Sequence, residues 1–335
     1  MAAEILPTHT PALFAAAVKV AAKRLRAGEV VALPTETVYG LAANALDEKA
    51  VAKIFQIKGR PAHNPIIIHV ASNEMAAACV AHWPAEAVKL SHAFWPGPLT
   101  LVLPRGKNIP DNVTAGGETV GVRWPSHPFM QAVIRECGFP LAAPSANLSN
   151  QISPTNAEHV RGQLADKISL IVDGGQSQVG IESTVLDLTT QPPRVLRPGM
   201  IHAESLAAVC GEISDHQSLL SDSTLRSPGL LAKHYSPQAK LLVLDWRDDA
   251  DLLAQLSTFN FQLSTTHVIA HTKIPAGFPA EKVSVIPHDA EAYARALYGE
   301  LHRCDAHGAT LIVVEAPPET AEWSGIADRL RRAAA

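Results

Sequence analysis

Two short motifs in the first half of the chain combine positive charge with hydrogen-bonding groups. Lys58 and Arg60 flank a glycine, while Ser145 and Asn147 lie two residues apart among small side chains. A lysine supplies a point charge and an arginine a planar fork of donors, and both suit phosphate oxygens. Alone, the first motif also fits a solvated basic loop, and the second an ordinary loop of small residues. Taken with the polar residues described next, they indicate a pocket for an anion.

Other polar residues occur at or near the ends of predicted strands. Thr35 and Thr37 follow a buried strand, where their hydroxyls could serve a ligand or satisfy the backbone of their own turn. His69 lies in an apolar strand, where a histidine is more often a satisfied core residue than a functional one. Arg123 lies in another, where it needs a partner, either an anionic ligand or a structural carboxylate. Ligands of open α/β sheets tend to bind at strand ends, where the chain also carries Asn64, Thr119, Ser183 and Arg197.

The common signatures of nucleotide, metal and acyl-transfer sites are missing from the sequence. There is no G-x-x-x-x-G-K-[ST] loop, and no G-x-G-x-x-G follows a strand. Neither H-E-x-x-H, C-x-x-C nor G-x-S-x-G occurs. An anion site in this protein must therefore be built from residues scattered along the chain, and no dedicated set of metal ligands is predicted.

Composition limits the kind of protein that this chain can be. With 335 residues, 47% of them hydrophobic, the chain is long enough for two domains with sizeable cores. Its formal net charge of −4 argues against broad binding to nucleic acid or to anionic membranes. The four cysteines are far apart in the sequence, so we expect reduced thiols. No signal peptide and no apolar run of about 20 residues is evident, which leads us to expect a cytoplasmic protein.

Capping residues and apolar spacing predict the elements that must position these side chains. A helix is predicted over residues 10–28, with a threonine at its start and a glycine at its end, and a buried strand follows at 29–34. Asp47 caps a second helix that ends at Lys58 and carries apolar residues at the spacing of one helix face. Further strands are predicted at 65–70, 99–103, 120–124, 141–143, 168–172, 183–188 and 194–196, and helices near 73–82, 85–93, 126–137 and 155–164. Because several strands follow one another without a helix, we expect a mixed sheet with helices packed on it.

The character of the sequence changes after residue 211. Residues 212–238 are rich in Ser, Asp, Pro and His and have little periodicity, which predicts a linker. Residues 239–335 then alternate between strand and helix patterns, with strands at 240–245, 267–271, 283–286 and 311–315 and helices at 248–257, 289–305 and 319–332. We therefore predict a large first domain, residues 1–211, and a small doubly wound α/β domain after the linker.

Six ordered motifs resemble the YrdC-like family. They are P-T-E-T-V-Y-G-L, K-G-R-P-x-x-N-P-I, F-W-P-G-P-L-T-L, V-G-V-R-W-P, A-P-S-A-N-x-S and E-S-T-V. The resemblance covers residues 10–205, and S-P-G-L-L-A-K-H-Y-S-P at 227–237 extends it. By length and pattern, the terminal domain resembles that of the long, two-domain threonylcarbamoyl-AMP synthases. The resemblance implies a YrdC-like twisted mixed sheet with helices, joined by the linker to a small Rossmann-like α/β domain.

The resemblance also implies a nucleotidyltransferase reaction. L-threonine and bicarbonate give a carbamate, whose carboxylate attacks the α-phosphate of ATP. Pyrophosphate leaves, and L-threonylcarbamoyladenylate forms. A separate enzyme then transfers the threonylcarbamoyl group to the tRNA adenosine beside the anticodon. A magnesium ion would be expected on the phosphates, with few dedicated protein ligands.

The family roles fall on residues of the motifs. The resemblance implies a catalytic tetrad of Lys58, Arg60, Ser145 and Asn147. It implies further contacts to ATP from Asn64, Thr119, Arg197 and Tyr235, the last of these in the linker, which would fold over the nucleotide as a lid. It implies that threonine is held by Thr35 or Thr37, His69, Arg123, Ser183 and the backbone near Ala143.

The sequence favours this function over two others. The same fold could bind RNA without catalysis, but the net charge of −4 speaks against it. Carbamoyl-adenylate chemistry in hydrogenase maturation would bring acylphosphatase and zinc-finger segments, which this chain lacks. The C-terminal domain shows no glycine fingerprint and is predicted to be a structural or regulatory cap. We expect a monomer, and the sequence leaves direct tRNA binding open.

Overall fold

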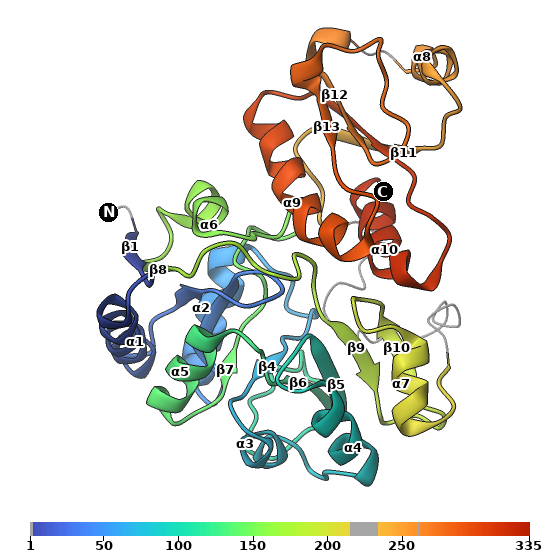
Figure 1. Cartoon of the computed structure of the whole chain (residues 1–335). Helices are drawn as coiled ribbons and strands as arrows, with labels where there is room; N and C mark the ends of the chain where they lie inside the picture. Colours follow the sequence, from blue (N-terminus) through green and yellow to red (C-terminus); the bar gives the residue numbers. More distant parts are fainter. Residues whose placement is uncertain (1–2, 215–233, 260–261) are drawn as a thin grey trace. The chain divides into compact units, whose positions relative to one another are not determined.

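The computed structural model describes residues 3–214, 234–259 and 262–335, which form two compact units (Figure 1). The first unit holds the described residues up to Ser149 and those from Ser153 to Ser214. The second holds Asn150–Ile152 and the described residues from His234 onward. Most of the predicted linker, residues 212–238, lies outside the described residues. Each unit is described here by itself.

The first unit is built on one ten-stranded sheet. The strands are β1 (Glu4–Pro7), β2 (Val31–Leu33), β3 (Gly40–Asn44), β4 (Ile68–His69), β5 (Leu99–Pro104), β6 (Thr119–Arg123), β7 (Leu141–Ala142), β8 (Leu170–Asp173), β9 (Thr184–Asp187) and β10 (Arg194–Arg197). Their order is β1-β8-β2-β3-β7-β4-β6-β5-β9-β10. Some neighbours are parallel, such as β4 and β6, and others are antiparallel, such as β5 and β6. The predicted mixed sheet is confirmed.

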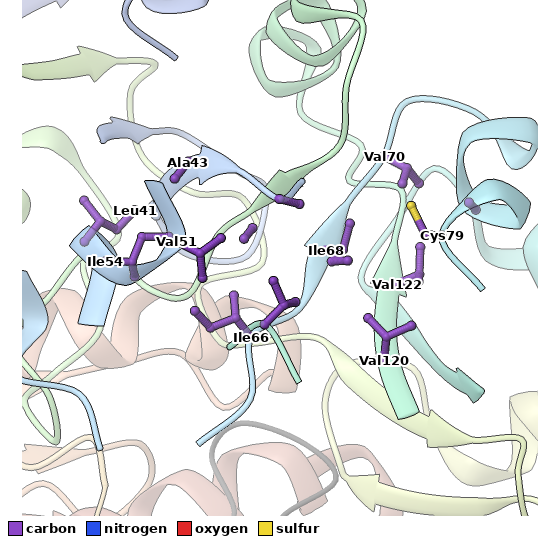
Figure 2. Close-up of a cluster of buried hydrophobic side chains, with 14 of the residues drawn as sticks. Leu41, Ala43, Val51, Ile54, Ile66, Ile68, Val70, Cys79, Val120 and Val122 are labelled. Atoms are coloured by element: carbon purple, nitrogen blue, oxygen red, sulfur yellow. The ribbon is translucent and has the colours of Figure 1, made fainter. Parts of the chain in front are cut away.

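Helices cover both faces of this sheet. On one face, α1 (Pro11–Arg26) and α5 (Pro128–Cys137) pack against β2, β3, β7 and β8. On the other face, α2 (Glu48–Lys58) and α6 (Ala157–Leu164) join a second apolar cluster. Figure 2 shows Val51 and Ile54 of α2 beside Leu41 of β3, with Ile66, which precedes β4, between them and Ile68 of β4. The other α-helices among the described residues of this unit are α3 (Asn73–Ala78), α4 (Ala85–Phe94) and α7 (Ala203–Cys210).

Helix α2 begins and ends where its capping residues predict. The side chain of Asp47 accepts hydrogen bonds from the backbone N–H groups of Lys49 and Ala50. At the other end, Gly59 adopts a φ of 62°, a left-handed conformation that a glycine takes without strain. The last helical residue is Lys58, so the cap places this lysine where the chain turns back toward the sheet.

The second unit contains a parallel four-stranded sheet. Its order is β11 (Lys240–Leu244), β14 (Leu311–Glu315), β12 (Thr266–Ala270) and β13 (Val283–Val285). The helices α8 (Asp249–Ser257), α9 (Ala290–Ala306) and α10 (Ser324–Ala333) follow β11, β13 and β14 along the chain, and only a short 3-10 helix separates β12 from β13. Leu252 and Leu256 of α8 pack against Val268 and Val313 of the sheet. The predicted small Rossmann-like domain is confirmed.

Several elements differ from the predictions. Strands β1 and β3 and helix α7 were not predicted, and β3 escaped because its sequence, GLAAN, has small residues and no strand-like alternation. The strand predicted at 65–70 is reduced to Ile68–His69, since Pro65 cannot donate a ladder hydrogen bond. The helix predicted at 73–82 ends at Ala78, and the last helix begins only at Ser324. Within the described residues, no helix combines the length and the apolar character that crossing a membrane requires.

Candidate functional site

Helix α2 brings Lys58 to the loop that follows strand β7. The Nζ atom of Lys58 lies 2.6 Å from the backbone oxygens of Ser145 and Asn147 and 3.2 Å from Oδ1 of Asn147. In return, the backbone N–H of Ser149 donates to the Lys58 carbonyl at 2.9 Å. The structure therefore brings together the two motifs that the sequence singles out, and the lysine holds the loop in shape.

The charge of Lys58 is buried without a carboxylate partner in the described part of the chain. Only 3% of the residue is exposed, and its ammonium contacts are all with neutral oxygens. Burial and the neighbouring Arg60 lower the pKa of Lys58 well below its usual range. Keeping a cation in such surroundings is costly unless an anion compensates it. The site thus favours a bound anion.

Arg60 and Asn64 form a second group beside Lys58. Nε of Arg60 donates to the Asn64 carbonyl at 3.0 Å, and Nη2 donates to Oδ1 of Asn64 and to the Pro65 carbonyl, both at 2.7 Å. The buried Nδ2 of Asn64 has no hydrogen-bond partner among the residues that the structure describes. Because buried donors are nearly always satisfied, this amide points to an acceptor that a ligand would supply.

Arg123 has the structural carboxylate that the sequence left as one of two alternatives. Its Nη2 lies 2.7 Å from Oε1 of Glu36, and the two side chains are only 5% and 6% exposed. Nε also donates to the Gly97 carbonyl at 3.3 Å. The ion pair accounts for the burial of Arg123, and it leaves open a second role toward a ligand.

The contacts of the two threonines distinguish them. Oγ1 of Thr35 donates to the Val38 carbonyl at 2.6 Å and accepts from the backbone N–H groups of Thr37 and Val38. This hydroxyl satisfies its own turn. Oγ1 of Thr37 instead accepts from Nη1 of Arg123 at 2.9 Å. Thr37 therefore shares the arginine's surroundings, and these contacts favour it over Thr35 as the residue that meets a substrate.

His69 is a buried neutral histidine beside Arg123 in the sheet. Burial, with a smaller contribution from the Arg123 charge, lowers its pKa to about 3, while a hydrogen bond with the Ile67 backbone acts in the opposite direction. His69 and Arg123 are register partners on β4 and β6. Its Nδ1 atom is buried and has no hydrogen-bond partner within the described ranges. This nitrogen is available to a ligand group.

The depressed pKa of His69 predicts an acid-sensitive stability. The folded protein keeps His69 neutral, while the unfolded chain binds a proton below its model value of 6.5, so stability is lost as the pH falls from about 6.5 toward about 3. Between pH 7 and 5 this loss is about 2 kcal/mol. In urea denaturation, His69→Gln should lose about 2 kcal/mol less of its free energy of unfolding between pH 7 and 5 than the wild type does. The matched change His92→Gln, at an exposed position on α4, should lose as much unfolding free energy between pH 7 and 5 as the wild type. An equal loss in all three proteins would contradict the assignment of this pH dependence to His69.

Ser183 and Arg197 come together at the ends of β9 and β10. Nε of Arg197 donates to the Ser183 carbonyl at 3.1 Å, and Nη2 donates to its Oγ at 3.2 Å. Oγ of Ser183 also lies 2.8 Å from Oγ1 of Thr100. An expected threonine contact and an expected ATP contact are thus bonded directly to each other.

The remaining predicted residues are more dispersed. Thr119 begins β6, which ends at Arg123, so the two residues lie about 13 Å apart along the strand. Ala143 is buried, and its N–H donates to the Ile67 carbonyl at 3.2 Å. Tyr235 belongs to the second unit, and its contacts are described with that unit below.

Comparison with known proteins gives this arrangement a family. A family model described as Telomere recombination matches residues 23–199, and one described as Threonylcarbamoyl-AMP synthase, C-terminal domain, matches residues 201–335. A threonylcarbamoyl-AMP synthase of Pyrococcus abyssi is 41% identical over 321 residues, which cover 94% of this chain and 93% of that protein. The chain belongs to the threonylcarbamoyl-AMP synthase family.

Two further matches support membership of the threonylcarbamoyl-AMP synthase family. The threonylcarbamoyl-AMP synthase of Bacillus subtilis is 42% identical over 321 residues, covering 94% of this chain and 92% of that protein. The crystal structure of P. abyssi Sua5 complexed with L-threonine matches with a TM-score of 0.90 at 38% identity, covering 100% of this chain and 98% of that one. The similarity extends through both units.

Sequence reasoning missed two buried carboxylates that lie within the synthase family's own motifs. Glu36 pairs with Arg123, and Oε1 of Glu182 accepts from Oγ of Ser153 at 2.6 Å. Both glutamates directly precede hydroxyl residues of the predicted site, Thr37 and Ser183. The signal that could have found Glu36 is the unpaired arginine itself, because a buried Arg123 requires an anion somewhere in the fold.

The magnesium ion that the resemblance implies would need few ligands from protein side chains. Within residues 3–214, 234–259 and 262–335, no group of three His, Cys, Asp or Glu side chains is arranged to hold a metal ion. The negative charge of Glu36 is already compensated by Arg123.

Proposed function

We propose that this protein is a threonylcarbamoyl-AMP synthase, a nucleotidyltransferase that makes L-threonylcarbamoyladenylate from L-threonine, bicarbonate and ATP. The observation that carries the proposal is the buried Lys58, whose ammonium contacts the Ser145–Asn147 loop and has no carboxylate partner among the described residues. A nucleotide phosphate would supply the missing negative charge. Because the chain belongs to the threonylcarbamoyl-AMP synthase family, adenylation is the reaction expected at such a site.

The proposed reaction has two steps. The amine of threonine joins the carbon of bicarbonate and water leaves, giving a carbamate. A carbamate oxygen then bonds to the α-phosphorus of ATP as the bond from that phosphorus to the pyrophosphate oxygen breaks. A carboxylate is already a nucleophile, so its attack on the α-phosphorus needs no general base, and alignment supplies much of the rate of that step. Cations are needed because a carbamate, a carboxylate and a triphosphate must approach one another.

The proposed roles are those that the resemblance to the family implies. The phosphates would be held by Lys58, Arg60, Asn64, Ser145 and Asn147. Further contacts to the nucleotide would come from Thr119, Arg197 and Tyr235. Threonine would be held by Thr37, His69, Arg123, Ser183 and the backbone near Ala143. Thr35 would stabilise the turn that carries Thr37. Magnesium would arrive with the phosphates of ATP.

The domain assignment belongs to the same proposal. Residues 1–211 would form the catalytic domain and residues 239–335 the small C-terminal domain. Residues 212–238, of which the structure describes 212–214 and 234–238, would close the site against water as a lid. We further propose a cytoplasmic monomer whose product passes to a separate enzyme that transfers the threonylcarbamoyl group to tRNA.

The proposal is tested by following pyrophosphate release from ATP with purified full-length protein. Release should require both L-threonine and bicarbonate, and mass spectrometry should detect the threonylcarbamoyl adenylate. Omitting either substrate, or replacing L-threonine by D-threonine, provides the controls. Salt-sensitive binding of RNA with no substrate-dependent ATP turnover would contradict the proposal and favour an RNA-binding module.

A further inference from the structure

Tyr235 has an unusual backbone conformation in the second unit. Its φ is 63°, in the left-handed region that a residue with a side chain seldom adopts. Only 1% of the residue is exposed. A tyrosine keeps such a backbone when the contacts around it determine its conformation. The partners of its ring are therefore informative.

Two helices of the second unit contact the ring of Tyr235. The ring of Tyr298, from α9, is stacked on it with 5.9 Å between centroids and 29° between planes. The guanidinium carbon of Arg329, from α10, lies 5.4 Å from the same centroid. Stacking and cation–π contacts both favour particular ring orientations, so the two helices hold the ring in one position.

Helix α10 also holds the main chain next to this ring. Arg329 is fully buried, and its Nη1 lies 3.0 Å from Oδ2 of Asp328. Asp328 pairs with Arg332 as well, at 3.0 Å. The carbonyl of Arg332 accepts the backbone N–H of His234 at 3.1 Å. One helix thus contacts both the residue before Tyr235 and the Tyr235 side chain.

The residue after Tyr235 is tied to an early part of the chain. The backbone N–H of Ser236 donates to the Asn150 carbonyl at 2.9 Å, and Gln151 and Ser236 form a parallel bridge. Asn150 stands three residues beyond Asn147 in the sequence, in the stretch that continues the loop held by Lys58. The Tyr235 segment is therefore joined on one side to α10 and on the other to the continuation of a loop proposed to bind nucleotide.

We propose that Tyr298 and Arg329 are positioning residues for adenylation and act by holding Tyr235 in its left-handed conformation. The inference rests on the proposed function, in which Tyr235 contacts ATP. It gives α9 and α10 a part in the reaction, whereas the sequence predicted only a structural or regulatory cap. Neither residue need touch the substrate, because each acts through the ring of Tyr235.

The test is a double-mutant cycle on the full-length chain. Tyr235→Ala, Tyr298→Leu and the variant with both changes are compared by equilibrium ATP affinity and by KM for ATP in threonine-dependent pyrophosphate release. Tyr298→Leu should weaken ATP binding by roughly two- to tenfold in the wild-type background and by nothing further when Tyr235 is already alanine. KM for threonine should be unchanged. Tyr298→Phe, which keeps the ring, should retain the wild-type affinity for ATP.

A parallel cycle and a matched control separate positioning from a general loss of structure. Arg329→Met is paired with Tyr235→Ala in the same way, which keeps the test decisive if Tyr298→Leu does not fold. Tyr293→Leu changes another buried tyrosine of α9, one whose ring packs 5.1 Å from that of Trp323, and its effect should be equal in both backgrounds. This inference alone would be overturned if the losses of ATP affinity were additive in the Tyr298 and Arg329 cycles while the wild-type chain still turned over threonine and ATP. A wild-type chain without such turnover would overturn the proposed function and this inference with it.

Discussion

Replacing Lys58 with alanine is expected to lower threonine-dependent pyrophosphate release by about 100-fold or more. The variant loses the buried positive charge that would meet the phosphates of ATP. It also loses the donor that contacts the carbonyls of Ser145 and Asn147, so the loop loses the group that shapes it. Steady-state measurements at varied ATP should show the loss in both kcat and kcat/KM.

A second lysine of helix α2 provides the control for this experiment. Lys53 is exposed, and its Nζ donates to the Gly28 carbonyl at 2.6 Å, away from the Ser145–Asn147 loop. Lys53→Ala should keep activity within about twofold of the wild type, in line with a surface substitution. If Lys58→Ala folds and behaves like Lys53→Ala at all ATP concentrations, Lys58 has no part in the reaction.

Replacing Arg123 with methionine is expected to destabilise the protein by about 3–5 kcal/mol, because it leaves Glu36 charged, buried and unpaired. Urea denaturation followed by circular dichroism measures this loss. The stability effect alone cannot distinguish a structural arginine from one that also binds the carboxylate of threonine. A second variant is needed to separate the two roles.

The double variant Glu36→Gln with Arg123→Met removes both charges of the pair. It should recover most of the lost stability, since no uncompensated charge stays buried. KM for threonine should nevertheless rise by about tenfold or more, because the cation that faces Thr37 is gone. Normal use of threonine by a stable double variant would show that Arg123 serves the fold only. Glu36→Gln alone, which leaves the arginine in place, is the matched control.

The sequence predicts the parts of this protein that leave a local pattern. Asp47 and Gly59 bound helix α2 because capping requires particular side chains and a left-handed residue. The C-terminal strands were predicted from short apolar runs such as that at 311–315, although no glycine fingerprint accompanies them. Strand β3 was missed because its small residues, Gly40–Asn44, carry no strand-like alternation.

Contacts between distant segments leave no such pattern. Lys58 and the Ser145–Asn147 loop were predicted to share a pocket, but nothing in either motif reveals that the lysine donates to the carbonyls of that loop. The partner of Arg123 was likewise left open, since a single Glu36 in a turn of hydroxyl residues has no periodicity to mark it as buried. The roles assigned to individual residues remain predictions that the variants above test.

The three residues Asn150–Ile152 have a consequence for how the chain is synthesised. They leave the ribosome with the first half of the protein, yet their pairing partner in the second unit, Ser236, follows much later. Until then, the carbonyl of Asn150 lacks the N–H that it accepts in the finished protein. Because domains fold as they emerge, the nascent first unit should complete its sheet while the Asn150 carbonyl still lacks the N–H of Ser236. The proposed site would then reach its final form only when the C-terminal half has been made, so an unfinished chain should not consume ATP.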